Sequence, residues 1–304
     1  MTAIATPATR RSLGRRLFGR QPLGYLFVAP YVVFLAAIFA YPLGFAVYIS
    51  FHDYFFAAPG AIVERPFVGL QNFTDALADP VFRRAMLNVL IFLVINVPLT
   101  VAVGLVLATA LNAAIPFRTF FRASYFVPYV TASVAVIGVW LWLFNSGGLV
   151  NNLIGPLAPD PSWLVNSFWA MPIIALFATW KQLGLYILLY LAALQNIPEE
   201  LYEAAEVDGA GPVRRFLAVT VPGVRPTTTL VVIAATITGA NFFTEPYLLT
   251  GRGGPNGASV SPVLLMYTQG IEQGHAGYAA AIGVLLAIMV MAVSLVNRYL
   301  LERS

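Results

Sequence analysis

EELYEAAEVDGAGPVRRFLAVTVPGVRP, residues Glu199–Pro226, is the polar stretch that divides a chain made otherwise of long apolar runs. It holds five of the chain's thirteen carboxylates and separates two of those runs. Carboxylates are costly inside hydrocarbon, so this stretch must lie in water or against another protein. The apolar runs on either side are therefore predicted to be membrane-spanning helices that this loop connects.

The loop itself is predicted to fold as a helix, a tight turn and a second helix. Pro198 suits the start of the first helix, with glutamates 199 and 200 at the positive end of its dipole. Gly209 can take the left-handed conformation that ends a helix, and Pro212 can begin the next one. The spacing of its apolar residues gives the second helix one apolar face. This face comprises Val213, Phe216, Leu217 and Thr220.

Composition places the rest of the chain in a membrane. Of its 304 residues, 59% are hydrophobic and 10% are charged, whereas soluble domains carry about 25% charged residues. There is no cysteine, and the two histidines, His52 and His275, lie far apart, which argues against a metal site. The only lysine, Lys181, follows Trp180, so no phosphate-binding GxxxxGK[ST] loop is present. We expect no enzymatic activity in this chain and no nucleic-acid partner, and ATP would have to be bound by another chain.

Six apolar runs are long enough to cross a hydrocarbon layer of about 30 Å. The first is much longer than the apolar core of a cleaved signal peptide, so we expect it to remain as a span. The prediction is an all-α protein with a polar tail over residues 1–22 and one membrane domain over 23–304, in which residues 195–226 form the polar loop. The spans are expected at 23–51, 85–112, 120–144, 168–194, 227–249 and 277–300.

The distribution of basic residues predicts the orientation. If the N-terminus is cytoplasmic, twelve arginines fall on the inside and four on the outside, with Lys181 left within a span. An excess of basic residues marks cytoplasmic loops, so both termini and the polar loop are expected inside. The inside set is Arg10, Arg11, Arg15, Arg16, Arg20, Arg118, Arg122, Arg214, Arg215, Arg225, Arg298 and Arg303; the outside set is Arg65, Arg83, Arg84 and Arg252.

The polar loop also carries a spaced motif. Glu203-Ala204-Ala205 is followed by three residues, Gly209, nine residues and then Val219-x-Val221-Pro222. This resembles the EAA loop of ABC importer permeases of the maltose-importer kind, with valine in place of the usual isoleucine and leucine. Further segments resemble the same family, so that the resemblance runs in order from residue 25 to 300. They are VGLQNF at 68–73, FFTEPYLLTGRGGP at 242–255 and GYAAA at 277–281.

The resemblance implies a type I importer permease that forms the pathway of a sugar by alternating access. It implies as partners a second homologous permease, a dimeric ATP-binding-cassette ATPase that carries ATP and Mg, and an extracytoplasmic solute-binding protein. The location would be the inner or plasma membrane of a bacterium or archaeon. The residues implied in contact with the ATPase are Glu203, Ala204, Ala205, Asp208, Gly209 and Pro222. The alternative interpretation is a solvated loop with ordinary helix caps.

Polar residues inside spans are candidates for the solute pathway. In the family, sugar contacts lie on the two spans that flank the EAA loop. Amides, hydroxyls and aromatic rings suit sugar hydroxyls and C–H faces. By helical spacing Thr238, Asn241 and Glu245 would share one face. The candidates are Lys181, Gln182, Tyr186, Thr238, Asn241 and Glu245, and hydrogen bonding between helices is the alternative role for each.

Lys181 leaves the solute open, because an ammonium group within a span needs water or a partner. Glu245 is one candidate partner and an anionic group of the solute is another. Glycerol-3-phosphate or a related phosphodiester is therefore an alternative to a neutral sugar. A proton-coupled secondary transporter is an alternative of another class, with Lys181 and Glu245 as its only relay. A membrane enzyme is disfavoured by the histidine and cysteine counts.

Overall fold

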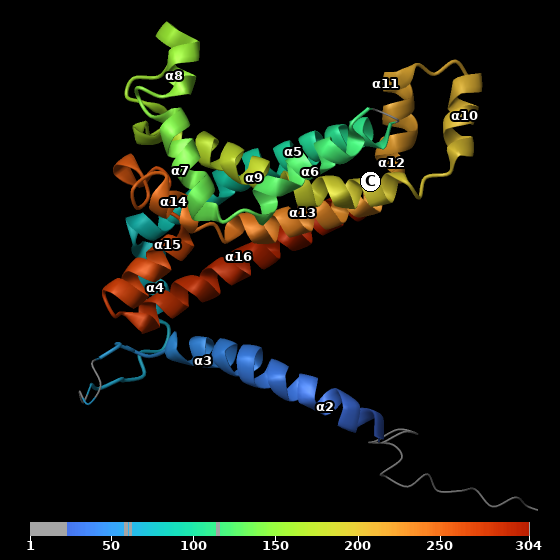
Figure 1. The fold of residues 1–304 in the computed structure, drawn as a ribbon. Helices are drawn as coiled ribbons and strands as arrows, with labels where there is room; N and C mark the ends of the chain where they lie inside the picture. Colours follow the sequence, from blue (N-terminus) through green and yellow to red (C-terminus); the bar gives the residue numbers. More distant parts are fainter. Residues whose placement is uncertain (1–22, 58–59, 61–62, 114–115, 304) are drawn as a thin grey trace, which may run out of the picture. The chain divides into compact units, whose positions relative to one another are not determined.

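The computed structural model describes residues 23–57, 60, 63–113 and 116–303. The polar tail predicted at residues 1–22 lies outside the described residues. Within them, the regular secondary structure is helical, and two isolated bridges join His52 to Phe67 and Phe55 to His275. Six helices are long and apolar enough to cross a membrane, which confirms the predicted fold class and number of spans. The chain divides into two units, up to Ile49 and from Ser50 onward (Figure 1).

The first unit is one interrupted apolar helix. It consists of α2 (Leu23–Leu35), a π-helical turn (Ala36–Ala40) and α3 (Tyr41–Ile49). Pro42 has no N–H with which to bond the preceding turn, and the π-helical turn lies directly before it. The helix ends close to the predicted boundary of this span, because Ile49 is its last residue.

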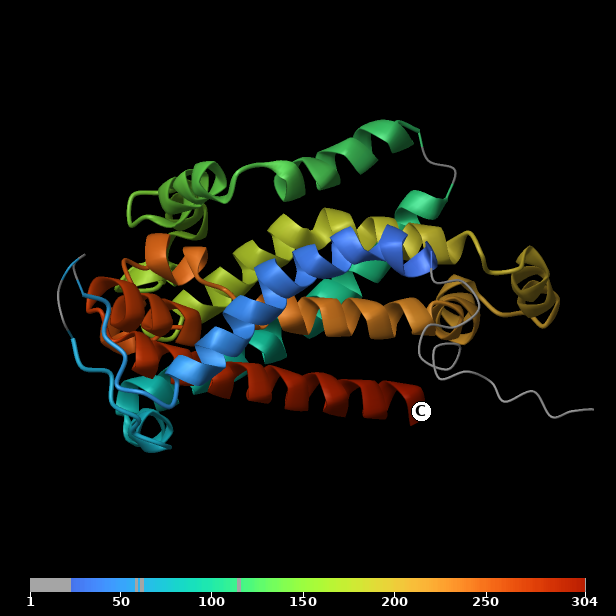
Figure 2. The same ribbon diagram turned by 90° about the horizontal axis from the view of Figure 1, so that it is seen from below.

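Four long helices form the body of the second unit. They are α5 (Pro80–Asn112), α9 (Ala170–Leu194), α13 (Arg225–Ala240) and α16 (Ala276–Arg303). Helix α9 packs against α5 and α13, and α13 also packs against α16 (Figure 2). Within the apolar stretch of each span, 61% of the residues are buried in α9 and only 22% in α16. Helix α9 is therefore the central helix. This central position places the side chains of α9 between the other spans.

Buried amides tie these helices together. Asn96 of α5 donates through Nδ2 to the hydroxyl of Thr179 on α9 at 2.8 Å. Asn88, also on α5, donates to the carbonyl oxygens of Gly257 and Val260 at 2.9 Å each. Polar groups between membrane helices contribute about 0.6–2 kcal/mol per hydrogen bond and fix which faces meet. The two hydrogen bonds donated by Asn88 hold the loop that follows α14 against α5.

The third predicted span, 120–144, is wrong in its bounds. The chain forms two helices there, α6 (Arg118–Val130) and α7 (Ser133–Phe144), and the apolar candidate span is Ser133–Leu157. Between them, Thr131 has an extended backbone and Ala132 is also non-helical. Two features end α6. Pro128, three residues before Thr131, has no N–H to donate, and the hydroxyl of Thr131 donates to the Val127 carbonyl at 2.7 Å. Helix α6 instead lies along α9.

The fifth predicted span is also interrupted. Helix α13 ends at Ala240, and a short helix, α14 (Thr244–Leu248), follows. The side chain of Asn241 donates to the carbonyl of Ile237 at 2.7 Å, while its backbone N–H turns to Thr238 at 3.3 Å. The side chain thus takes the acceptor that another helical turn would use.

The second span begins earlier than predicted, since Asp79 caps α5 by accepting from the Val81 N–H at 2.8 Å.

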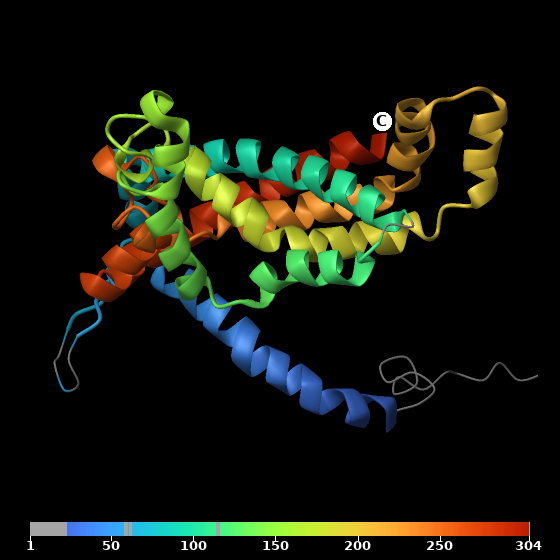
Figure 3. The same ribbon diagram turned by 45° about the horizontal axis from the view of Figure 1, so that its top comes forward.

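Short helices lie at the two ends of this unit. At one end are the start of α16 and four short helical segments: α4 (Gln71–Ala78), α14, α15 (Pro262–Tyr267) and the π-helical turn Thr268–Glu272. Helix α8 (Leu149–Ile154) and the 3₁₀ turns Gly155–Leu157, Trp163–Val165 and Pro255–Gly257 complete the connections. At the opposite end, a helical hairpin projects beyond the long helices (Figure 3).

Candidate functional site

The projecting hairpin is the polar loop that the sequence singled out. It consists of α10 (Glu199–Val207), a turn, and α11 (Pro212–Arg215), which continues through a π-helical turn (Phe216–Thr220) and α12 (Val221–Gly223). This confirms the predicted order of helix, glycine turn and helix. Of the residues predicted to contact a partner, Ala205 is half-buried and the others are exposed. The exposed set is Glu203, Ala204, Asp208, Gly209 and Pro222.

Gly209 sets the geometry of the turn. Its φ is 75°, the left-handed region that glycine enters freely. The N–H of Ala210 binds the carbonyl of Ala205 at 2.9 Å, and the N–H of Gly209 binds that of Glu206 at 2.9 Å. This pair of bonds is the Schellman arrangement, which satisfies carbonyls that the end of α10 would otherwise leave without donors. A glycine is therefore required here by backbone conformation.

Side chains brace the two arms of the hairpin. Arg215 binds Glu206 at 2.7 Å, and the hydroxyls of Tyr202 and Thr220 lie 3.0 Å apart. Both contacts join α10 to the helix that follows the turn. The ion pair is partly solvated and contributes at most about 1 kcal/mol, so the braces act together with the Schellman turn rather than alone.

The base of the hairpin is joined to the long helices. A Cβ on Gly223 would lie 2.6 Å from Cδ1 of Ile197, so the segments that enter and leave the hairpin are in close contact there. Val224 is fully buried. Arg225 then donates through Nε and Nη2 to the carbonyl of Leu301 near the end of α16, at 3.1 and 2.6 Å. The hairpin is therefore connected to both α13 and α16.

The predicted pathway residues do not form one group. The hydroxyl of Tyr186 donates to Oε1 of Gln182 at 3.3 Å, and the side chain of Thr238 on α13 interacts with the same hydroxyl. These three form a polar cluster between α9 and α13. Tyr186 is only 2% exposed, whereas Gln182 is half-buried and Thr238 is exposed, so these two are the accessible members of the cluster.

Asn241 lies elsewhere, and the prediction that it shares a helical face with Thr238 and Glu245 is wrong. Helix α13 has ended before Asn241, and Glu245 belongs to α14. The Asn241 side chain caps α13 and lines a separate groove of about 650 Å³ between α13, α15 and α16. That groove is mostly apolar, with Ser294 and Arg298 as its other polar residues.

Lys181 and Glu245 interact only through space. The positive charge of Lys181 acts on the Glu245 carboxylate, but no ion pair forms between them within 4.0 Å. Within the described part of the chain, Lys181 makes no hydrogen bond. Its side chain is partly exposed. Glu245, one of the two partners predicted for Lys181, therefore lies near its charge but forms no ion pair with it.

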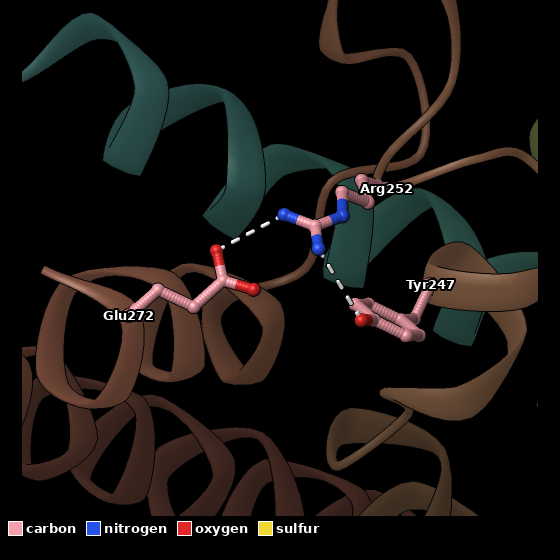
Figure 4. A network of polar contacts seen from close by, with 3 residues as sticks. All are labelled: Tyr247, Arg252 and Glu272. Atoms are coloured by element: carbon pink, nitrogen blue, oxygen red, sulfur yellow. Dashed lines mark hydrogen bonds and ion pairs between the residues drawn. The ribbon is translucent and has the colours of Figure 1, made fainter.

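One polar network was not anticipated from the sequence. Arg252 reaches Glu272 at 3.1 Å and the hydroxyl of Tyr247 at 3.4 Å, and its guanidinium lies 5.4 Å from the Tyr247 ring centre (Figure 4). The Glu272 carboxylate raises the pKa of Arg252 above its ordinary value. This network joins the segment after α14 to the turn before α16. The backbone of Arg252 is in the left-handed region, with a φ of 71°.

Comparison with known proteins identifies the architecture. The family described as binding-protein-dependent transport system inner membrane component matches residues 82–304. The chain belongs to this family. It is 34% identical over 302 residues to the arabinooligosaccharides transport system permease protein AraP of Bacillus subtilis (strain 168), covering 97% of this chain and 94% of the relative. It is 32% identical over 282 residues to the lactose transport system permease protein LacF of Rhizobium radiobacter, covering 91% and 93%.

A solved structure has the same fold. It is the crystal structure of a bacterial alginate ABC transporter in complex with alginate pentasaccharide-bound periplasmic protein, with a TM-score of 0.74 at 21% identity, over 95% of this chain and 97% of that one. The resemblance to ABC importer permeases inferred from the EAA motif is thus confirmed. This chain is a multi-pass inner-membrane component of a transport system and not a catalytic enzyme. The roles of the individual loop and pathway residues stay predictions.

Proposed function

We propose that this chain is a permease subunit of an ATP-driven, binding-protein-dependent importer, and that its solute is a sugar. The observation that carries the proposal is the braced hairpin α10–α12, which is exposed at its tip and fixed at its base to α13 and α16. A rigid projection of this kind transmits force from a partner to the spans. Two relatives are named as permease proteins of transport systems for arabinooligosaccharides and for lactose, and these names support a sugar as the solute.

The partner at the hairpin would be a separate ATPase dimer that holds ATP and Mg. Glu203 is an exposed carboxylate on α10, beside the small residues Ala204 and Ala205, so the helix can lie close in a cleft of that partner. ATP-driven closure would then push α10, tilt the spans and turn a cavity from one membrane face to the other. No covalent step falls to this chain.

The remaining partners follow from the same proposal. A second homologous permease would complete the pathway, and an extracytoplasmic binding protein would deliver the solute. The bias of arginines supports a cytoplasmic location for the hairpin and both termini. The binding protein would then meet the end that carries α4, α14 and α15.

An anionic solute is a second candidate, because Lys181 has no bound partner in the described chain. An ammonium group inside a span is retained where it pairs with a mobile charge or with water. A sugar phosphate or phosphodiester would provide that charge. A neutral sugar would require water at Lys181 instead.

The test is reconstitution of the permease with its ATPase, second permease and binding protein in proteoliposomes. Sugar-loaded binding protein should stimulate ATP hydrolysis and drive uptake. Lys181→Gln should leave uptake of a neutral oligosaccharide intact and should abolish uptake of a phosphorylated one. Uptake by this chain alone, driven by a proton gradient without ATP, would refute the proposal.

A further inference from the structure

A cavity of about 710 Å³ lies where α7 ends. Its walls come from the last residues of α7, from the segment 160–165 and from Leu249 after α14. This is the end of the unit opposite α10–α12 (Figures 1 and 3). The cavity is separate from the polar cluster of Gln182, Tyr186 and Thr238, none of which lines it. Its volume lies within the range of small-molecule sites, which is about 300–1,000 Å³.

Hydrogen bonds hold the walls of this cavity in place. The hydroxyl of Ser162 donates to the carbonyl of Phe144 at 3.0 Å, which ties the segment 160–165 to the end of α7. Asn151 links the same two walls a second time, because its Nδ2 donates to the carbonyl of Ser146 at 3.0 Å and its Oδ1 accepts from the indole N–H of Trp163. A site whose walls are fixed beforehand loses little entropy when a ligand enters.

The lining combines apolar surface with a few polar groups. Leu141, Leu164 and Val165 contribute hydrocarbon, and Asn145 and Asp160 contribute an amide and a carboxylate. Neither the side-chain nitrogen of Asn145 nor the carboxylate of Asp160 makes a hydrogen bond or ion pair with any described residue. An apolar lining with a few convergent polar groups is typical of a small-molecule site. A sugar ring matches both parts, since its hydroxyls suit the amide and the carboxylate and its C–H faces suit the hydrocarbon.

The charge of the lining limits the kind of sugar. Asp160 is the only charged residue that lines the cavity in the described part of the chain. A phosphate or carboxylate group on the ligand would therefore meet a like charge and no arginine or lysine, and like charges at close range repel. The hydroxyls of a neutral sugar would instead donate to that carboxylate, and hydrogen bonds to a charged group are the stronger kind.

We propose that this cavity binds one end of a neutral oligosaccharide before the solute enters the pathway between α9 and α13, and that Asp160 excludes anionic sugars. The inference rests on the proposed function, because it takes the solute to be a sugar and this end of the unit to face outside. It favours the neutral solute over the phosphorylated one. The oligosaccharide would meet the cavity on its release from the binding protein.

The test uses the absence of cysteine from this chain, so that V165C introduces its only thiol at the cavity wall. The assembled transporter is placed in nanodiscs without ATP or binding protein, and labelling of this chain by an impermeant maleimide is followed by mass spectrometry. Neutral arabinotriose should slow the labelling at least fivefold, and anionic trigalacturonate should not. In N145A/V165C the arabinotriose concentration that halves the rate should rise about tenfold, because one polar contact is lost. In D160N/V165C trigalacturonate should also protect, because the repulsion is removed.

The matched control is L153C, which lies on α8 in the same region, is 77% exposed and does not line the cavity. Arabinotriose should leave its labelling unchanged. Equal protection of L153C and V165C, or no protection of V165C by arabinotriose, would overturn the proposal. Protection of V165C by sugar-free binding protein alone would assign the cavity to a protein contact instead. A transporter whose ATP hydrolysis responds to sugar-loaded binding protein but whose V165C is not protected refutes this site alone, whereas protection without that response refutes the proposed function alone.

Discussion

The substitution Gly209→Val tests how much the backbone conformation of the hairpin turn matters, separately from how the turn packs. An added Cβ at Gly209 meets nothing within 4 Å, so the first atom of a new side chain has room. Its cost arises from φ, which is 75° in the turn. A residue with a Cβ loses about 1–2 kcal/mol in the left-handed region, and a β-branched residue is the least tolerated there. This corresponds to a roughly 5- to 30-fold smaller population of the braced turn.

The expected result is loss of coupling without loss of assembly. In proteoliposomes that contain all partners, Gly209→Val should still bind the ATPase, because the exposed face of α10 is unchanged. Solute uptake should fall by a comparable factor, and ATP hydrolysis should lose its dependence on solute-loaded binding protein. Gly209→Asn should be milder, since asparagine tolerates the left-handed region better than other residues with a side chain.

Gly211→Ser is the matched control. Gly211 also meets nothing within 4 Å of an added Cβ, but its φ is −68° and it caps α11, a position that serine favours. It should transport as the wild type does. If Gly209→Val couples hydrolysis to uptake as well as Gly211→Ser, the hairpin is only a linker and the mechanism proposed for it is wrong.

Three further predictions follow from the fold. Gln182→Ala should weaken uptake by roughly 1–3 kcal/mol in apparent solute affinity while the complex still assembles; unchanged uptake over a range of solute concentrations would remove this residue from the pathway. Gly184→Ala should lower the free energy of unfolding by roughly 1–3 kcal/mol in a thermal melt, because its Cβ would lie 2.8 Å from Cα of Phe126 on α6. Gly138→Ala, which meets nothing within 4 Å, should melt like the wild type. A cysteine at Asp160 should react with an impermeant thiol reagent in intact cells and one at Glu206 should not; labelling at Glu206 would reverse the proposed orientation.

The hairpin was predictable because its determinants are local. The Schellman turn needs a glycine directly after the last helical residues, and Asp208-Gly209 provides it within the sequence itself. The second helix begins at Pro212, as N-terminal proline preference predicts. Six spans were likewise predictable, since length and hydropathy alone decide them.

The interruptions of the spans were not predictable in the same way. Hydropathy does not change at Asn241, where the helix ends because a side chain replaces a backbone donor at Ile237. Nor does it change at Thr131, where the hydroxyl and Pro128 close α6. At both endings a polar side chain donates to a carbonyl of its own helix, and hydropathy does not report such a bond. This is why Asn241 was grouped with Thr238 although it faces another groove.

The pattern of contacts suggests how a push on the hairpin would be divided between the spans. Gly223 and Val224 hold the base of the hairpin against Ile197 and the buried core, so α10 cannot hinge freely at its own start. Arg225 binds the Leu301 carbonyl with two nitrogens, and this links the first turn of α13 to the last turns of α16. We therefore expect a displacement of α12 to be passed on to both α13 and α16. The polar cluster of Gln182, Tyr186 and Thr238 lies where α13 meets the central helix α9. The contact that a solute would meet is thus the one that such a movement would change.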